Sequence, residues 1–282
     1  MKLSSNRSIN CKGKLLSFSQ PLVMGILNIT PNSFFDGGQH NSMQNAVTQT
    51  KKMLDDGADI IDIGGYSSQL NADFVTEEME IDRLIPVIEV LVKTFPDIII
   101  SVDTFRAAVA EKAIEHGAAI INDISGGTLD ENMFDVVGKH QVPYILMHMR
   151  GTPQNMQQFV DYDDLVSDII YYFSERLEKA YQAGIKDVII DPGFGLFSKT
   201  LAQNYELLSK LNMFQHLDVP ILAGVSRKSM IYNLLSISPK EALNGTTVLN
   251  TLALTKGADI LRVHDVKEAI ECVKIVKKTY EK

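Results

Sequence analysis

The sequence contains only two cysteines, one near each end of the chain, and they lack the spacing of a metal site. Cys11 and Cys272 are therefore expected to be free thiols in a reducing compartment. The N-terminal residues lack the apolar core of a signal peptide, and no apolar run approaches the ~20 residues that a membrane helix needs. These absences predict a cytoplasmic protein with no membrane partner.

The chain also lacks an excess of positive charge and the common nucleotide-binding motifs. Its net charge of -8 argues against a nucleic-acid-binding surface, so an anionic ligand would need local cationic groups. Neither G-x-G-x-x-G nor G-x-x-x-x-G-K-[ST] occurs, and no pair of histidines has zinc spacing. No Ser-His-Asp or Cys-His order stands out either. The chemistry must therefore come from other residues.

What the sequence does contain is a repeated pattern of apolar runs that each end in a polar residue. The first run ends at Asn28, and Pro31 prevents its continuation as a strand. Seven further runs end in the same way along the chain. The expected strands cover residues 21–28, 58–65, 98–104, 119–124, 143–148, 187–191, 220–225 and 259–264.

Helical spacing of apolar residues separates these runs. Helices are expected over 42–56, after Thr76, over 162–183 and over 266–280. Strands that alternate with helices form parallel sheets, and a doubly wound open sheet shares this alternation with a closed barrel. Eight repeats with polar strand ends favour an α/β fold of the (β/α)8 TIM-barrel type.

The remaining organisation is simple. Residues 1–20 alternate between polar and apolar side chains around Gly13, which predicts a short N-terminal β-hairpin that closes the far end of the barrel. No linker, low-complexity tract or sequence repeat interrupts the chain. We therefore expect a single domain over residues 1–282.

Three polar residues stand at the ends of expected strands that a barrel would bring together. Asp103, Asn122 and Asp191 would point into one pocket, where carboxylates and an amide suit a flat heterocycle rich in N–H donors and carbonyls. Paired hydrogen bonds to a carboxylate supply both orientation and affinity. The alternative is that each aspartate only caps the helix that follows it.

Cationic residues follow the last two expected strands. Lys228 lies in the segment S-R-K-S, and Arg262 and His264 lie two residues apart on the same side of a strand. Phosphate is commonly bound at this position in such barrels. Asn28 offers an oxygen to a hard cation such as Mg²⁺. The alternative is a surface arginine and a structural histidine.

Seven motifs in order resemble those of the dihydropteroate synthases. They are M-G-I-L-N-I-T-P-N-S-F-F-D-G-G, S-V-D-T, I-N-D-I, M-H-M-R-G-T-P, D-P-G-F-G, S-R-K-S and R-V-H-D-V, and they span about residues 20–275. The resemblance implies a TIM-barrel transferase of folate biosynthesis, usually a homodimer. Such an enzyme joins p-aminobenzoate to a dihydropterin carried as its pyrophosphate, and sulfonamides mimic its p-aminobenzoate.

The resemblance also implies roles for individual residues, with Mg²⁺ as the cofactor and two loops that close over small-molecule substrates. It assigns Asp103, Asn122, Met147, Asp191 and Lys228 to the pterin; Asn28, Arg262 and His264 to the pyrophosphate, with Asn28 also on the metal; Ser68, Gln69, Phe197 and Ser229 to p-aminobenzoate; and Phe34, Asp36 and Lys228 to catalysis.

The chain departs from the family pattern in three places. Asn32 stands where T-P-D-S-F has its aspartate, residues 67–71 read S-S-Q-L-N instead of S-T-R-P-G or S-S-R-P-G, and one extra residue precedes Lys199. The extra residue makes the position of Phe197 a question for the structure. Loss of the arginine at Gln69 predicts weak capture of p-aminobenzoate and weak inhibition by sulfonamides.

Two other functions share part of this pattern. A pterin-dependent methyltransferase barrel has similar Asp and Asn pterin contacts but lacks the S-R-K-S and R-V-H residues. A degenerate paralogue would bind pterins without making dihydropteroate, and the altered 67–71 segment is the only feature that supports it.

Overall fold

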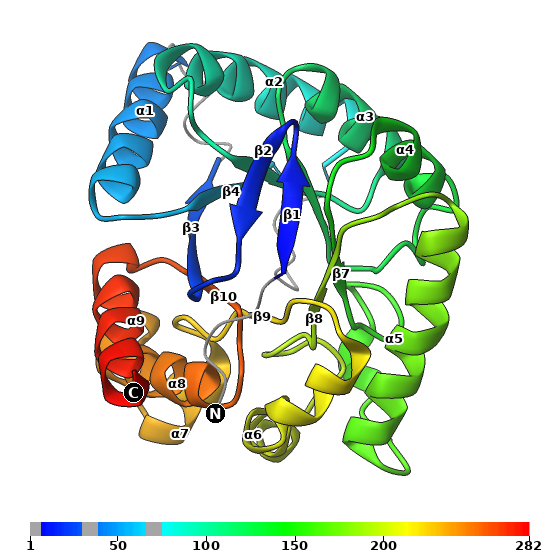
Figure 1. Ribbon diagram of the computed structural model, residues 1–282, viewed down its shortest axis with the longest axis vertical. Helices are drawn as coiled ribbons and strands as arrows, with labels where there is room; N and C mark the ends of the chain where they lie inside the picture. The colour runs from blue at the N-terminus through cyan, green and yellow to red at the C-terminus, as the bar shows by residue number, and fades with distance from the viewer. Residues whose placement is uncertain (1–6, 30–38, 66–74, 282) are drawn as a thin grey trace.

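Eight parallel strands form a ring that is surrounded by helices (Figure 1). The computed structural model describes residues 7–29, 39–65 and 75–281. The strands follow the order β8-β7-β6-β5-β4-β3-β10-β9, and a parallel bridge between Ile190 and Ile221 joins the two ends of this row. The strands are β3 (Leu22–Asn28), β4 (Ile60–Gly64), β5 (Ile100–Asp103), β6 (Ile120–Asp123), β7 (Tyr144–Met147), β8 (Val188–Asp191), β9 (Leu222–Ala223) and β10 (Ile260–Val263).

Helices follow each strand and cover the outside of the ring. Among the described residues, no helix combines the length and apolar character that a membrane span requires. Thr76 caps α2 by accepting a hydrogen bond from the backbone N–H of Met79, as the sequence predicted. The helices are α1 (Gln39–Asp55), α2 (Glu77–Thr94), α3 (Ala107–Glu115), α4 (Met133–His140), α5 (Leu165–Gln182), α6 (Leu201–Ser209), α7 (Ser229–Leu235), α8 (Leu243–Thr255) and α9 (Val266–Tyr280).

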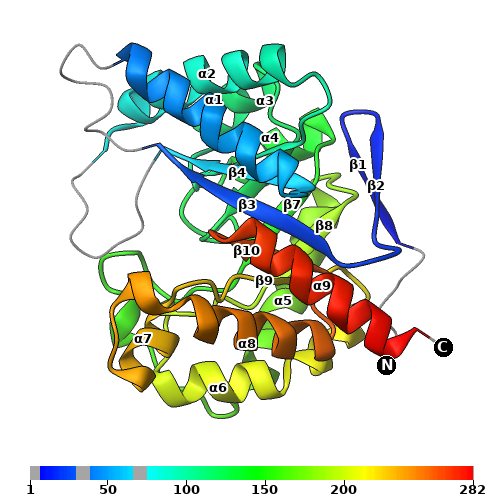
Figure 2. The ribbon, with the colours of Figure 1, turned by 90° about the vertical axis from the view of Figure 1, so that its left-hand side faces the viewer.

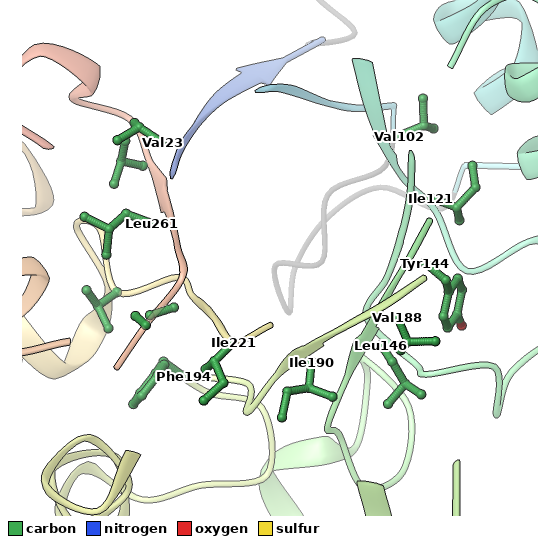
Figure 3. Packing of buried hydrophobic residues seen from close by; sticks show 14 of the residues in the cluster. Val23, Val102, Ile121, Tyr144, Leu146, Val188, Ile190, Phe194, Ile221 and Leu261 are labelled. Carbon is green, nitrogen blue, oxygen red and sulfur yellow. The ribbon is translucent and has the colours of Figure 1, made fainter. Parts of the chain in front are cut away.

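Alternate strand residues divide between two cores. Side chains such as Val102, Ile121 and Ile190 point away from the ring and pack in the main core with the helices (Figure 3). The neighbouring side chains point into the barrel because side chains alternate along a strand. A separate cluster there includes Ile120 and Ile189. Each strand therefore supplies both the outer core and the interior.

An antiparallel hairpin closes the N-terminal end of the barrel (Figure 2). It consists of β1 (Ser8–Cys11) and β2 (Lys14–Ser17). Ile9 packs in the interior cluster, and the backbone N–H of Asn10 donates to Asp187 Oδ2 at 2.8 Å, just before β8. The hairpin does not cover the opposite end of the barrel, where the C-terminal ends of the strands lie.

The predicted barrel and hairpin are confirmed. The strands are slightly shorter than expected, and the difference is largest for the run 220–225, of which only Leu222–Ala223 is strand. The strand ends at Ala223, and a turn at 226–227 leads the chain into α7. Cys11 and Cys272 are both buried and unbridged, so the expected free thiols are also confirmed.

Candidate active site

The predicted polar residues meet at the C-terminal end of the barrel. Asp103 pairs with Asn122 across β5 and β6, and Asp191 ends β8. Asn122 and Asp191 are only 4% and 5% exposed, so each needs polar partners. Burial raises the pKa of Asp191, and the nearby Lys228 opposes that rise.

Arg262, on β10, bonds carboxylates on two other strands, β4 and β5. Its Nη2 donates to Asp103 Oδ2 at 2.8 Å, and its Nε donates to Asp62 Oδ2 at 2.6 Å. Asp62 is fully buried in β4 and also accepts from Asn122 Nδ2 at 3.2 Å. One continuous network of charge-assisted bonds therefore joins β10, β4, β5 and β6.

Lys228 and Asp191 both approach Gly224, which follows β9. A Cβ built on Gly224 would lie 3.7 Å from Lys228 Nζ, 3.8 Å from Asp191 Oδ2 and 3.9 Å from Arg262 Cβ. Lys228 Nζ also donates to the Phe194 carbonyl oxygen. Burial lowers the pKa of Lys228 to about 8, while Asp191 opposes the change. The ammonium and the carboxylate thus form the polar wall of one pocket.

The two adjacent cations of S-R-K-S have different roles. Arg227 donates from Nε and Nη2 to Asp265 at 2.8 and 2.9 Å and from Nη1 to the carbonyl of Pro239 at 2.9 Å. Those bonds hold the loop after β9 against the start of α9. Arg227 is therefore structural, and Lys228 is the cation that faces the pocket.

His264 directly follows β10, two residues after Arg262, at the C-terminal rim of the barrel. Its Nδ1 is 3.1 Å from Ser226 Oγ, and its backbone N–H donates to the same hydroxyl at 3.2 Å. Desolvation by the surrounding chain, followed by the charge of Arg262, lowers the pKa of His264. The imidazole is therefore neutral at pH 7, and because Ser226 contacts Nδ1, the other ring nitrogen is available to an anion.

The structure answers the question about Phe197. Its ring centroid lies 5.1 Å from Lys228 Nζ, and the ring packs with Met147. Ser198 adopts a left-handed backbone conformation with φ of 57° and is fully buried. Phe197 therefore lies beside Lys228 despite the extra residue before Lys199.

A buried basic pair supports that loop from behind. Lys199 is 4% exposed, and its Nζ lies 3.0 Å from His148 Nδ1 and donates to the Phe197 carbonyl at 3.0 Å. Burial lowers the pKa of Lys199 to about 7. Burial, followed by the charge of Lys199, lowers the pKa of His148 well below its usual range. His148 is thus packed and lies beneath the pocket.

Asn28 ends β3 and is exposed at the same rim. Among the described residues, no three His, Cys, Asp or Glu side chains group to form a metal site by themselves. A single amide oxygen fits Mg²⁺ only where substrate phosphates and water complete the octahedron, which is the arrangement this ion commonly adopts. Asn28 therefore suits a metal that arrives with a pyrophosphate.

The remaining predicted residues are only partly placed. Ser229 begins α7 directly after Lys228 and is half-buried. The loop residues assigned to catalysis and to p-aminobenzoate, together with the departures at 32 and 67–71, lie outside the described residues. Those assigned loop residues are Phe34, Asp36, Ser68 and Gln69.

Sequence reasoning missed Asp62, although a signal was present. Ile60-Ile61-Asp62 has the same form as Ile-Ile-Asn at 120–122 and Ile-Ile-Asp at 189–191. The last residue of all three triplets points into the barrel. The triplet alone assigns Asp62 no partner, because the strand continues beyond it to Gly64 and the residues it contacts are distant in the sequence.

Known proteins match this chain over almost its whole length. Residues 24–264 fit the family described as pterin binding enzyme. The Escherichia coli (strain K12) dihydropteroate synthase is 43% identical over 270 residues, which cover 95% of each chain. The Xanthomonas albilineans dihydropteroate synthase, solved with 4-aminobenzoic acid, has a TM-score of 0.89 at 38% identity and covers 98% of each chain.

A second solved structure agrees with the first. It is the Yersinia pestis dihydropteroate synthase with a sulfonamide drug complex, which has a TM-score of 0.90 at 43% identity and covers 97% of this chain and 99% of that one. With the polar strand ends and the cations in place, the chain belongs to the dihydropteroate synthases, a family of pterin-binding transferases.

Proposed function

We propose that this protein condenses 7,8-dihydropterin pyrophosphate with p-aminobenzoate to give 7,8-dihydropteroate and pyrophosphate. The observation that carries the proposal is the connected group of polar side chains at one end of the barrel. Asp191, Lys228 and Arg262 lie around Gly224. Arg262 also bonds Asp103, and through Asp62 it is linked to Asn122. Hydrogen-bond acceptors for a heterocycle and cations for an anion are thus close together.

The pterin would lie against the acceptors. Asp191 uses Oδ1 to accept from the backbone N–H of Gly193 at 2.8 Å, so Oδ2 stays available to ring N–H groups. Lys228 beside it can donate to the ring carbonyl. Met147 and Phe197 supply the apolar faces. A flat ring with N–H donors on one edge fits this set.

The pyrophosphate would extend toward β10. Arg262 commits Nε and Nη2 to carboxylates, which leaves Nη1 and the neutral imidazole of His264 for phosphate oxygens. Asn28 would hold Mg²⁺, which neutralises charge on the pyrophosphate when it is bound. These donors stabilise the negative charge that develops on the leaving group.

The reaction needs no covalent enzyme intermediate. The bond between the exocyclic carbon and the pyrophosphate oxygen breaks, and the electron-rich pterin supports the positive charge at that carbon. The amine nitrogen of p-aminobenzoate then forms the new C–N bond and loses a proton. Phe34 and Asp36 are proposed to act in the loop that excludes water from this step.

The p-aminobenzoate would approach past Phe197 and Ser229. The Xanthomonas albilineans relative is described with 4-aminobenzoic acid, which supports this second substrate. Ser68 and Gln69 are proposed to complete its site. The S-R-K-S and R-V-H residues argue against a pterin-dependent methyltransferase, because a methyl-transfer site has no leaving pyrophosphate to bind.

We further propose a cytoplasmic homodimer. The buried, unbridged Cys11 and Cys272 support a reducing compartment. Helices α7 and α8 expose large apolar side chains that suit a partner surface, namely Leu234, Leu235, Val248 and Leu252. Sedimentation of the parent beside Val248→Glu tests the dimer, since the charge should produce monomers. A parent that sediments as a monomer would exclude it.

The activity is tested by mixing the protein with both substrates and Mg²⁺ and measuring the release of pyrophosphate and the formation of dihydropteroate. Equal amounts of the two products are expected only when p-aminobenzoate is present. Excess chelator should stop the reaction, and added Mg²⁺ should restore it. Pterin binding without any product would instead identify a degenerate paralogue.

A further inference from the structure

We infer that Asp62 is a positioning residue that aligns the pterin-binding and pyrophosphate-binding halves of the site through a single carboxylate oxygen. The inference rests on the proposed function but concerns a residue to which neither the family motifs nor the site chemistry assigns a role. It follows from where Asp62 lies and from which two side chains it holds.

Asp62 reaches its partners across the barrel interior. It lies in the middle of β4, and its strand neighbours Ile61 and Ile63 face the outer core. β6 is two strands away in one direction and β10 is two strands away in the other. Oδ2 nevertheless bonds Asn122 at 3.2 Å and Arg262 at 2.6 Å. One atom thus connects residues that belong to different substrate groups.

The contact with Asn122 fixes which face of the amide meets the ligand. An ionised carboxylate only accepts hydrogen bonds, so the NH₂ group of Asn122 must point to Asp62. The carbonyl oxygen of Asn122 is then directed to the pocket, where it accepts from a ligand N–H. Without Asp62 the amide could rotate and present a donor, which would repel the same N–H.

The contact with Arg262 fixes the guanidinium plane. Asp62 holds Nε while Asp103 holds Nη2 at 2.8 Å, so two adjacent donors of the fork are fixed. Among the described residues, Nη1 has no partner and is the donor left for an anion. A guanidinium that keeps one orientation loses less entropy when the pyrophosphate binds.

Asp62→Asn tests this, because the variant keeps the shape but removes the negative charge and puts an NH₂ donor in place of one carboxylate oxygen. We expect Kd for dihydropterin pyrophosphate to rise roughly ten- to a hundred-fold in calorimetry. Affinity should fall for each fragment alone, both 6-hydroxymethyl-7,8-dihydropterin and pyrophosphate with Mg²⁺. The KM for p-aminobenzoate should stay within about twofold of the parent value.

Ser101→Ala is the matched control. Ser101 is the register partner of Asp62 on β5, is equally buried, and has no hydrogen-bond partner among the described residues. It should leave both fragment affinities unchanged. A double-mutant cycle of Asp62→Asn with Asn122→Ala should be strongly non-additive for the dihydropterin fragment. Additive effects, or loss of only one fragment, would overturn the inference.

A spectroscopic measurement on the parent covers the case in which Asp62→Asn does not fold. The Arg262 Nε–H signal, identified by its loss in Arg262→Lys, should exchange slowly with water both before and after dihydropterin pyrophosphate is added. Exchange as fast as that of an exposed arginine would contradict the hydrogen bond from Arg262 Nε to Asp62. A parent that binds substrates but makes no dihydropteroate would refute the proposed function without affecting this result.

Discussion

The two ends of the barrel use the same strands but opposite kinds of side chain. On four strands an inward-facing isoleucine near the start is followed two residues later by an inward-facing polar residue. The isoleucines, toward the N-terminal end of the barrel, pack with the hairpin. The polar residues, toward the C-terminal end, form the hydrogen-bonded site. The pairs are Ile60 and Asp62, Ile120 and Asn122, Ile189 and Asp191, and Ile260 and Arg262.

This difference separates stability from chemistry along each strand. The apolar end removes isoleucine side chains from water, which favours folding. The polar end buries carboxylates, and their raised pKa values reflect the cost of that burial. Substitutions at the two ends should therefore change different quantities, even when they are only two residues apart.

Asp191→Ala should give the largest effect, and it should be on binding. Each charge-assisted hydrogen bond contributes roughly 1.5–3 kcal/mol, so loss of a carboxylate that receives two should weaken dihydropterin pyrophosphate binding about a hundred-fold or more. Thermal stability should change little, because removal of the desolvated carboxylate offsets the loss of its contacts with the Gly193 N–H and Lys228. Calorimetry checks this beside Asp187→Ala, the acidic residue that precedes the same strand. Unchanged affinity in Asp191→Ala would remove it from the pterin pocket.

Ile189→Ala should give the opposite result. Ile189 is fully buried among the interior isoleucines, so a cavity should lower the free energy of unfolding by about 2–5 kcal/mol. The folded variant should bind dihydropterin pyrophosphate within about twofold of the parent. On one preparation, urea unfolding measures the free energy of unfolding and calorimetry measures the affinity. A large loss of affinity would show that the two ends are not separable.

The triple reversion Gln69→Arg, Leu70→Pro, Asn71→Gly should improve p-aminobenzoate capture. An arginine restores a charged donor worth about 1.5–3 kcal/mol, so KM for p-aminobenzoate should fall roughly ten- to a hundred-fold. Sulfonamide inhibition should strengthen by a similar factor, while pterin affinity should not change. Steady-state kinetics of the parent and the triple variant measure KM for p-aminobenzoate and the inhibition constant of a sulfonamide. A parent that is already saturated by micromolar p-aminobenzoate, and unaltered by the reversion, would refute the prediction.

Lys199→Met should produce the smallest change, in how stability depends on pH. The pKa of Lys199 is about 7 in the folded protein and near the ordinary 10.5 when unfolded, so the unfolded chain binds more protons between these values. Stability therefore rises with pH there, by at most about 1.4 kcal/mol per pH unit from this group. Urea unfolding from pH 7 to 9 should show a shallower rise in Lys199→Met. Exposed Lys186→Met should match the parent, and equal slopes in all three proteins would contradict the buried amine.

The strands, the hairpin and the polar strand ends were predictable because each depends on local order along the chain. Period-two burial, the cap at Thr76 and the polar tips at Asp103 and Asp191 are all visible in short windows. Asp62 was not found, because its partners Asn122 and Arg262 lie 60 and 200 positions away and meet it only through barrel closure.

Two other features also needed the fold. Arg227 and Lys228 are adjacent cations of similar sequence context, and only the structure shows that Asp265 takes the first and leaves the second to the pocket. Phe197 could not be placed from spacing, since an insertion can shift a side chain to either face. In the structure the Phe197 ring lies 5.1 Å from Lys228 Nζ.

The most direct test of the account is whether the pterin and pyrophosphate groups share one continuous site. Dihydropterin pyrophosphate should be titrated into the parent by calorimetry with Mg²⁺, first alone and then at several fixed concentrations of pyrophosphate. A single site that includes Asp191 and Arg262 predicts that the apparent Kd rises linearly with the concentration of free pyrophosphate. An apparent Kd that free pyrophosphate does not change would contradict the account.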